Sequence, residues 1–260
     1  MKSLERALRE LRARDRTALV PYFMAGATPD WVEHVRAAAQ GGADAIEIGL
    51  PFSDPMMDGA VIQAAGLRAL EAGTTFESVG QQVAGLDAGV PLIAMTYYNI
   101  FLHDGLERSA GRLEEFGFLG AIVPDLSLEE SNDWSSACAD RDVATIFLVA
   151  PSTPRERVEK VARASEGFVY ASARMAVTGA SDDEGRAAEV VSRVRACSDL
   201  PTYVGIGIST PIQAARNALV SDGVIVGSAL VQRVLDGASA HDVENFVRKF
   251  RDAIDVRVTD

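Results

Sequence analysis

The chain has few cysteines, and their placement argues against a disulfide-stabilised secreted protein. Only two occur among 260 residues, Cys138 and Cys197, and each stands alone within helix-like sequence. Neither a CxxC pair nor a regular cysteine spacing is present. We therefore expect two free thiols in a protein that folds in a reducing compartment.

Long apolar runs and runs of positive charge are also absent. No apolar stretch approaches the roughly 20 residues that cross a bilayer, and the N-terminal MKSLERALRELRARD is charged throughout, unlike a signal peptide. The 25 Lys and Arg residues are outnumbered by 37 Asp and Glu, which gives a net charge of −12 and a pI near 4.8. Such a surface does not displace counterions from phosphates. We expect a soluble, cytoplasmic protein that binds neither nucleic acid nor membrane.

Several motifs of common enzyme classes are missing. His34, His103 and His241 have no metal-ligand spacing, so no metal site is predicted, and His34 and His241 are expected to face solvent on helices. The sequence contains no GxSxG elbow, Walker loop or GxGxxG fingerprint; the GIG at 205–207 is followed by Ile208. These absences disfavour a hydrolase, a kinase and a dehydrogenase.

Strand-like and helix-like segments alternate along the whole chain. The strand candidates lack polar alternation, which is typical of parallel strands covered on both faces, and each is followed by a segment long enough for a helix. They are residues 18–24, 45–51, 91–98, 120–125, 143–150, 167–172, 201–207 and 222–227. Eight such units predict an α/β fold, a single (β/α)8 TIM barrel over residues 1–260, in line with the about 250 residues usual for this fold. An extra N-terminal helix over residues 1–15 is expected to close the bottom of the barrel.

A Thr-Pro pair follows three of the strand candidates. These pairs are Thr28-Pro29, Thr153-Pro154 and Thr210-Pro211. A threonine can cap a helix whose first turn contains the proline, because the N–H that proline lacks has no partner there. We therefore expect the three threonines to begin helices.

An acidic residue interrupts the second strand candidate. Glu47 stands between Ile46 and Ile48, where a buried charge is costly unless it is paired or functional. If both isoleucines face the surrounding helices, Glu47 faces the barrel interior, where burial raises its pKa toward that of a useful proton carrier. A structural carboxylate bonded to a tyrosine or a backbone amide is an equal alternative.

The loop after this strand carries two further carboxylates, Asp54 and Asp58. A loop aspartate usually bonds its own backbone to form a turn, so each alone is weak evidence. The active site of a TIM barrel lies at the C-terminal ends of its strands. Together with an inward Glu47, these residues indicate a paired-carboxylate acid–base site.

Glycine-bearing loops follow the last three strand candidates. They comprise residues 173–185, 204–209 and 226–230. Barrels commonly bind phosphate at this rim on backbone N–H groups and a helix N-terminus, and Arg174 could add positive charge. Other residues at strand ends, which either line a pocket or pack the rim, are Tyr97, Tyr98, Asn99 and Asp125.

The segment IEIGLPFSDPMMDGAVIQAA closely resembles the signature of the tryptophan synthase alpha chain family. The likeness continues in the same order through VPYFMAGATPD, MTYYN, IVPDLSLEE, RMAVTG, VGIGIST and VGSALV, over residues 20 to 231. The resemblance implies a single TIM barrel. It also implies a lyase that splits indole-3-glycerol phosphate into indole and glyceraldehyde 3-phosphate during tryptophan biosynthesis.

The resemblance also implies roles for particular residues. Glu47 matches the acid–base glutamate of the family, and Asp58 matches the loop aspartate that holds the indole N–H. The implied substrate-binding residues are Tyr22, Tyr97 and Asp125 at the wall and rim of the indole pocket, Tyr170 near the aspartate, Thr178 in the lid, and Gly179, Gly207, Gly227 and Ser228 around the phosphate.

A partner chain is implied as well. Alpha chains of this family bind a beta chain, as an alpha2-beta2 complex, and pyridoxal phosphate belongs to that partner, so no cofactor is expected in this chain. The alternatives are a stand-alone indole-3-glycerol-phosphate lyase and a non-catalytic paralogue that regulates a beta chain. Because docking needs no carboxylate buried in a strand, Glu47 argues against the paralogue.

Three residues depart from the family pattern. Ala176 stands where glycine is usual, Ser127 where proline is frequent, and Ile206 where phenylalanine is common. A backbone angle open to glycine is often closed to alanine. We therefore expect closure of the sixth loop to be the property most affected.

Overall fold

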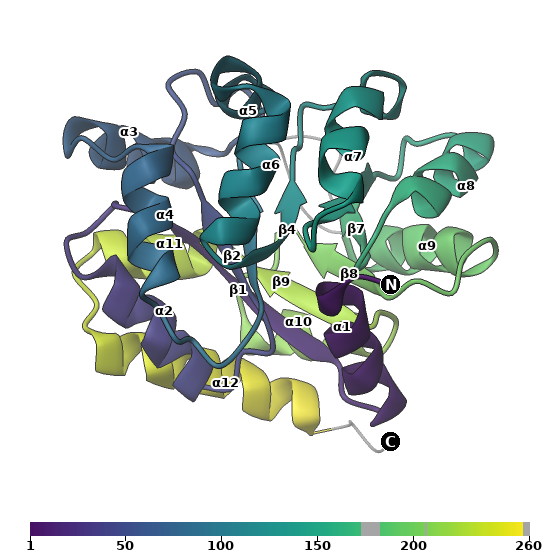
Figure 1. The fold of residues 1–260 in the computed structure, drawn as a ribbon. Coiled ribbons are helices and arrows are strands. Elements are labelled where there is room, and N and C mark those ends of the chain that lie inside the picture. Colours follow the sequence, from purple (N-terminus) through teal and green to yellow (C-terminus); the bar gives the residue numbers. More distant parts are fainter. Residues whose placement is uncertain (173–182, 206, 257–260) are drawn as a thin grey trace.

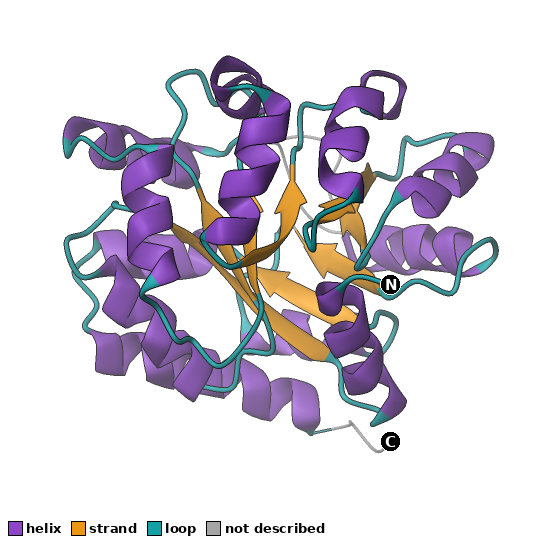
Figure 2. Ribbon diagram, in the orientation of Figure 1, coloured by secondary structure: helices purple, strands orange, loops and turns teal. Residues whose placement is uncertain are grey.

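The strands form one parallel sheet that curls into a barrel surrounded by helices (Figures 1 and 2). The computed structural model describes residues 1–172, 183–205 and 207–256. The strands are β1 (Ala18–Met24), β2 (Ile46–Gly49), β3 (Leu92–Met95), β4 (Phe118–Ile122), β5 (Ala144–Ile146), β6 (Leu148–Val149), β7 (Val169–Ser172), β8 (Thr202–Gly205) and β9 (Gly223–Val226). They pair in the order β5-β4-β3-β2-β1-β9-β8-β7-β6. The predicted TIM barrel is confirmed.

The described chain contains nine strands where eight were predicted, because the candidate 143–150 is interrupted at Phe147. Its first half, β5, pairs with β4, and its second half, β6, pairs with β7. At the interruption the Tyr170 N–H donates to the Phe147 carbonyl at 3.1 Å. This one stretch of chain therefore joins both edges of the sheet and closes the barrel.

Helices cover the outside of the barrel (Figure 2). They are α1 (Ser3–Ala13), α2 (Trp31–Gln40), α3 (Ala60–Glu71), α4 (Phe76–Ala84), α5 (Tyr98–Asp104), α6 (Leu106–Glu115), α7 (Asn132–Ala139), α8 (Arg155–Ala164), α9 (Asp183–Arg195), α10 (Pro211–Ala218), α11 (Ser228–Leu235) and α12 (Ala240–Asp255), with a 3-10 turn at Leu128–Glu130. None of the helices in the described ranges is long and apolar enough to span a membrane. His34, which was expected to face solvent, is buried, because α2 packs between β1 and α12.

Only one of the three predicted threonine caps is present. Thr210 caps α10, where its hydroxyl accepts from the Gln213 N–H and Pro211 occupies the first turn. The prediction is wrong for Thr153, whose hydroxyl accepts from the Ala150 N–H at 2.9 Å and closes a turn before α8. It is also wrong for Thr28, since α2 begins three residues later, at Trp31.

The N-terminal helix α1 closes the end of the barrel at which the strands begin (Figure 1). Leu4 and Leu8 insert into the apolar cluster inside the barrel. Leu4 is accommodated because Gly120 has no side chain: a Cβ there would lie 2.8 Å from the Leu4 Cδ2 atom. The extra N-terminal helix predicted from the sequence is thus confirmed, and it acts as the floor of the barrel.

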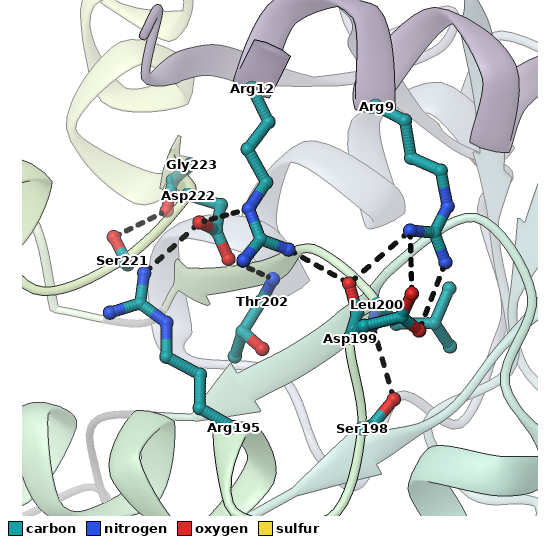
Figure 3. A network of polar contacts seen from close by, with 10 residues as sticks. All are labelled: Arg9, Arg12, Arg195, Ser198, Asp199, Leu200, Thr202, Ser221, Asp222 and Gly223. Atoms are coloured by element: carbon teal, nitrogen blue, oxygen red, sulfur yellow. Dashed lines mark hydrogen bonds and ion pairs between the residues drawn. The ribbon is translucent and has the colours of Figure 1, made fainter.

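Polar contacts hold α1 against the segments that precede β8 and β9 (Figure 3). The Arg9 guanidinium contacts both carboxylate oxygens of Asp199, at 3.1 and 3.2 Å. Arg12 donates to the Asp199 carbonyl at 2.8 Å, and its Nε lies 3.3 Å from the Asp222 carboxylate. Two successive turns of α1 therefore bind the segments that lead into β8 and β9.

Asp222 is the central acceptor of this network (Figure 3). Besides Arg12, its carboxylate accepts from Arg195 of α9 at 3.0 Å and from the Thr202 N–H of β8 at 2.9 Å. Its carbonyl accepts from the Ala18 N–H of β1 at 2.9 Å. One side chain thus links the starts of neighbouring strands to two helices.

Inside the barrel, glycines lie opposite bulky side chains. A Cβ at any of these glycines would overlap or press against the partner residue, so the close approach requires glycine. The pairs are Gly49 with Tyr22, Gly205 with Tyr170, Gly223 with Tyr203, and Gly120 with Leu4. The interior is therefore filled by complementary small and large residues.

Candidate functional site

A cavity opens at the C-terminal ends of the first strands. Its walls come from β1, β3, α3, the 50–58 loop and the residues that follow β3 and β4. Most lining side chains are apolar or aromatic, and Asp58 is the carboxylate among them. An apolar cavity with few polar groups is typical of a small-molecule site.

Glu47 points into the barrel, as its neighbours predicted. Ile46 and Ile48 pack in the outer core against the helices, so the side chain between them faces the interior. Glu47 is only 1% exposed, and its Oε1 atom has no hydrogen-bond partner. Burial raises its pKa from 4.5 to about 8, so the carboxyl is mostly protonated at neutral pH. A carboxyl with a pKa this close to neutral pH can give a proton and, once ionised, take one back.

Two tyrosines flank Glu47 inside the barrel. Tyr22 lies opposite Glu47 in the β1–β2 register, and its hydroxyl lies over Gly49. Tyr170 projects inward from β7 with its hydroxyl over Gly205. Burial, and then the negative charge of Glu47, raise the pKa of Tyr170 well above its usual value. Both hydroxyls are therefore neutral donors near a carboxyl that has little contact with water.

Asp58 is fixed at the cavity by Tyr97. Burial raises the pKa of Asp58, and a hydrogen bond to Tyr97 lowers it. The Tyr97 hydroxyl in turn accepts from the Met57 N–H at 2.8 Å, and its ring stacks on Phe52 with centroids 5.1 Å apart. The loop that carries Asp58 is thus held to the N-cap of α5. Asp54 of the same loop is exposed, and its carboxylate accepts from the Ser53 hydroxyl at 2.6 Å.

Removal of the Tyr97 hydroxyl is expected to alter Asp58. In Tyr97→Phe the carboxylate loses the hydrogen bond that favours its charged form, so the pKa of Asp58 should rise further. Carboxyl-carbon NMR titration measures this change. Tyr98→Phe is the matched control, because the Tyr98 ring faces Glu130 and Asp133 instead. An unchanged Asp58 titration in Tyr97→Phe would contradict the assigned contact.

The pKa of Glu47 also predicts how stability depends on pH. The unfolded chain releases this proton near pH 4.5, whereas the folded chain keeps it until about pH 8. The folded state therefore binds more protons between these values, and its stability falls as the pH rises through that window. We expect Glu47→Gln to lose this slope and to be more stable than the parent at pH 8. Urea unfolding at pH 5, 6.5 and 8 tests this, and parallel pH profiles would contradict it.

The predicted phosphate residues lie beside the last two strands. Gly207, after β8, has a φ of +99°, which favours glycine. Gly227 is the N-cap of α11, and Ser228 is its first residue. A Cβ at Gly227 would lie 3.8 Å from the Tyr22 Cβ atom, so this loop adjoins the cavity wall. Unpaired N–H groups at such a helix start favour an anion.

Three other predicted positions lie at the rim or at the start of a helix. Asp125 is exposed, and its carboxylate accepts from the Tyr98 N–H at 2.9 Å, so it stabilises the start of α5. Tyr98 and Asn99 belong to α5 and not to the end of a strand. Ser127 is exposed and precedes the 3-10 turn.

Part of the predicted site lies outside the described residues. This part comprises the predicted site residues Thr178 and Gly179, Arg174 with its added positive charge, and two of the departures from the family pattern, Ala176 and Ile206.

Several cavity residues escaped the sequence reasoning. Met24 and Met95 each lie two positions after an inward residue, Tyr22 and Ile93, and so share its face. That period of two was the available signal, because methionine at a strand end is otherwise unremarkable. The further lining residues that were missed are Leu50, Phe52, Pro55, Ile62, Gly66, Thr96 and Pro124.

These features define a (β/α)8-barrel protein with a buried carboxyl of raised pKa opposite Tyr22, which lines an apolar cavity, an arrangement suited to acid–base chemistry. The family model of the tryptophan synthase alpha chain matches residues 8–255. The chain belongs to the tryptophan synthase alpha chain family.

Individual relatives agree over nearly the full length. The tryptophan synthase alpha chain of Thermobifida fusca is 45% identical over 260 residues, which is 97% of this chain and 95% of that protein. The alpha chain of Methanosarcina mazei is 42% identical over 248 residues, 93% of this chain and 90% of that protein. A structure of Mycobacterium tuberculosis tryptophan synthase superposes with a TM-score of 0.90 at 38% identity, covering 97% of this chain and 98% of that one.

Proposed function

We propose that this chain cleaves indole-3-glycerol phosphate to indole and glyceraldehyde 3-phosphate by a retro-aldol reaction. The observation that carries the proposal is the inward Glu47 carboxyl, which is buried, unpaired at Oε1 and mostly protonated at neutral pH. A structural carboxylate would be bonded to its neighbours. The family membership of the chain supports the same reaction.

Glu47 is assigned both proton transfers. Its carboxyl gives a proton to indole C3, which leaves positive charge on the indole ring system. The resulting carboxylate then removes the proton of the hydroxyl on the adjacent side-chain carbon. As that oxygen becomes a carbonyl, the bond from C3 to the side chain breaks and its electron pair returns to the ring. Glu47 ends the cycle protonated, as it began.

Asp58 and the glycine loops are assigned to binding and charge stabilisation. The Asp58 carboxylate would accept from the indole N–H and stabilise the positive charge that develops on the nitrogen. Tyr22, Tyr97 and the apolar cavity walls would hold the indole ring. Gly207, Gly227 and Ser228 would bind the phosphate through backbone N–H groups. We assign Gly179 to the same phosphate and Thr178 to the lid. Tyr170 would keep Glu47 in position. Asp125 would keep the rim of the indole pocket in position.

We infer a beta chain as the partner, in an alpha2-beta2 complex, with pyridoxal phosphate bound only by that partner. No lysine lines the described cavity, and lysine is the residue that holds this cofactor. The solved relatives include structures of tryptophan synthase from Mycobacterium tuberculosis, which supports the complex. We further propose a single domain over residues 1–260, since one sheet includes all described strands, and a cytoplasmic location.

A mixing experiment tests the reaction and the partner together. Indole release from indole-3-glycerol phosphate is measured for the chain alone and with a tryptophan synthase beta chain. Strong stimulation on mixing is the expected result. High activity without the beta chain would favour a stand-alone lyase, which the family comparisons do not favour. No cleavage in either case would overturn the catalytic assignment and leave a regulatory paralogue.

A further inference from the structure

One wall of the cavity ends on a glycine in the middle of a helix. Gly66 lies within α3 and lines the cavity, although glycine weakens a helix interior. Close packing does not explain it: a Cβ at Gly66 would meet only the Met24 Cε atom, at 3.6 Å, and nothing else within 4 Å. By contrast, a Cβ at Gly80 of α4 would overlap the Phe116 ring. Gly66 therefore leaves room for about one methyl group before the Met24 Cε atom is reached.

The residue beside this space has a side chain that can change shape. Met24 is buried at the end of β1, and methionine is unbranched and fills irregular gaps. It packs in a cluster whose members on α3 include the small residues Ala65 and Ala69. The larger Val61 and Ile62 of α3 pack against the same cluster, so the small surface that α3 offers to the Met24 side chain is limited to the stretch around Ala65, Gly66 and Ala69.

Other cavity walls are held in place. The Thr96 hydroxyl donates to the Leu50 carbonyl at 3.1 Å. Phe52 stacks on Tyr97, whose hydroxyl is bonded to the Met57 N–H. The Met24 carbonyl accepts from the Ala27 N–H at 3.3 Å, but the Met24 side chain and Gly66 carry no strong hydrogen-bonding group. The flexible Met24 side chain therefore makes this wall the easiest to adjust.

We propose that Met24 and Gly66 set the size of the ring that the cavity accepts, and that the chain cleaves indole-3-glycerol phosphates bearing a small apolar substituent on the benzo ring. This inference rests on the proposed function. The reaction is the one described above, because the substituent lies on the six-membered ring and not at C3 or the nitrogen. The methyl-sized room between Gly66 and the Met24 Cε atom receives the added group, and the Met24 side chain adjusts around it.

The test uses five substrates: indole-3-glycerol phosphate and its 4-, 5-, 6- and 7-methyl derivatives, with the beta chain present. Formation of glyceraldehyde 3-phosphate, coupled to a dehydrogenase, gives kcat/KM for all five on one scale. We expect the parent chain to cleave at least one methyl isomer within about 10-fold of the unsubstituted substrate, less than the 10- to 200-fold discrimination of a tight pocket.

Two substitutions should move this preference in opposite directions. Gly66→Ala adds a methyl group at a distance that the fold tolerates, and it should lower kcat/KM for the accepted isomer about 10-fold more than for the unsubstituted substrate. Met24→Val shortens the movable wall and should raise the relative rate of the methyl isomers. Gly85→Ala is the control, because its Cβ would lie 3.8 Å from the nearest atom, at the end of α4.

The outcomes separate this inference from the proposed function. Rejection of all four isomers by more than 100-fold, or proportional changes for every substrate in both variants, overturns the inference while the lyase assignment stands. Failure to cleave the unsubstituted substrate overturns the proposed function and the inference with it. The inference is supported if the kcat/KM of the methyl isomers relative to the unsubstituted substrate falls in Gly66→Ala, rises in Met24→Val and stays unchanged in Gly85→Ala.

Discussion

Glu47→Gln is expected to lower kcat for indole-3-glycerol phosphate by about 1000-fold or more, within the range for loss of a general acid–base group. The amide has nearly the shape of the carboxyl that it replaces, but it neither gives nor takes a proton. Because the cavity walls come from other residues, the dissociation constant of the substrate should change little. Single-turnover rates and equilibrium binding measure the two quantities separately.

Glu47→Asp is the informative companion variant. It keeps the carboxyl but withdraws it by one methylene, so partial activity is expected if proton transfer is the role of residue 47. A purely structural role gives a different pattern: both variants would lose stability, and turnover would fall only as far as the folded fraction does. Turnover retained by Glu47→Gln would exclude the proton transfers assigned to this residue.

Asp222→Ala is expected to cause the largest loss of stability that we predict, about 3 kcal/mol in the free energy of unfolding. The substitution leaves Arg12 and Arg195 without their carboxylate and the Thr202 N–H without its acceptor (Figure 3). The Asp222 side chain is only 8% exposed, so water does not readily replace these contacts. Urea unfolding followed by circular dichroism measures the loss.

Asp199→Ala is a matched control on the same face of the barrel. Asp199 also pairs with an arginine of α1, but its side chain is 86% exposed, and exposed ion pairs contribute little. We expect a loss of less than about 1 kcal/mol. If the two variants were equally destabilised, burial would not explain the contribution of Asp222 to the free energy of unfolding.

The fold was predictable because its signals are local. Apolar runs without polar alternation indicate parallel strands, and the residues of each run are enough to identify it as a strand. The interruption at Phe147 was not predictable, because it depends on Tyr170 and the neighbouring strands that meet only when the barrel closes. The same limit applies to Thr153, whose hydroxyl could serve either a turn or the helix, and only the folded loop decides between them.

The candidate site was predictable where charge conflicts with its surroundings. Glu47 was found because a carboxylate between two isoleucines demands an explanation. Its pairing with Tyr22 across β1 and β2 could not be read from one strand alone. The place of Gly66 at the cavity could not be predicted either. A glycine within a helix lowers the stability of the helix, and its role becomes apparent only when the adjoining cavity is known.

The matched glycines and bulky residues inside the barrel restrict how the interior can change during evolution. A side chain larger than hydrogen at Gly223 fits only if Tyr203 becomes smaller, and the same holds for Gly49 and Tyr22. Substitutions at these positions therefore succeed as compensating doublets and fail as single steps. A single substitution at either member of a pair leaves an interior that is either overlapped or underfilled.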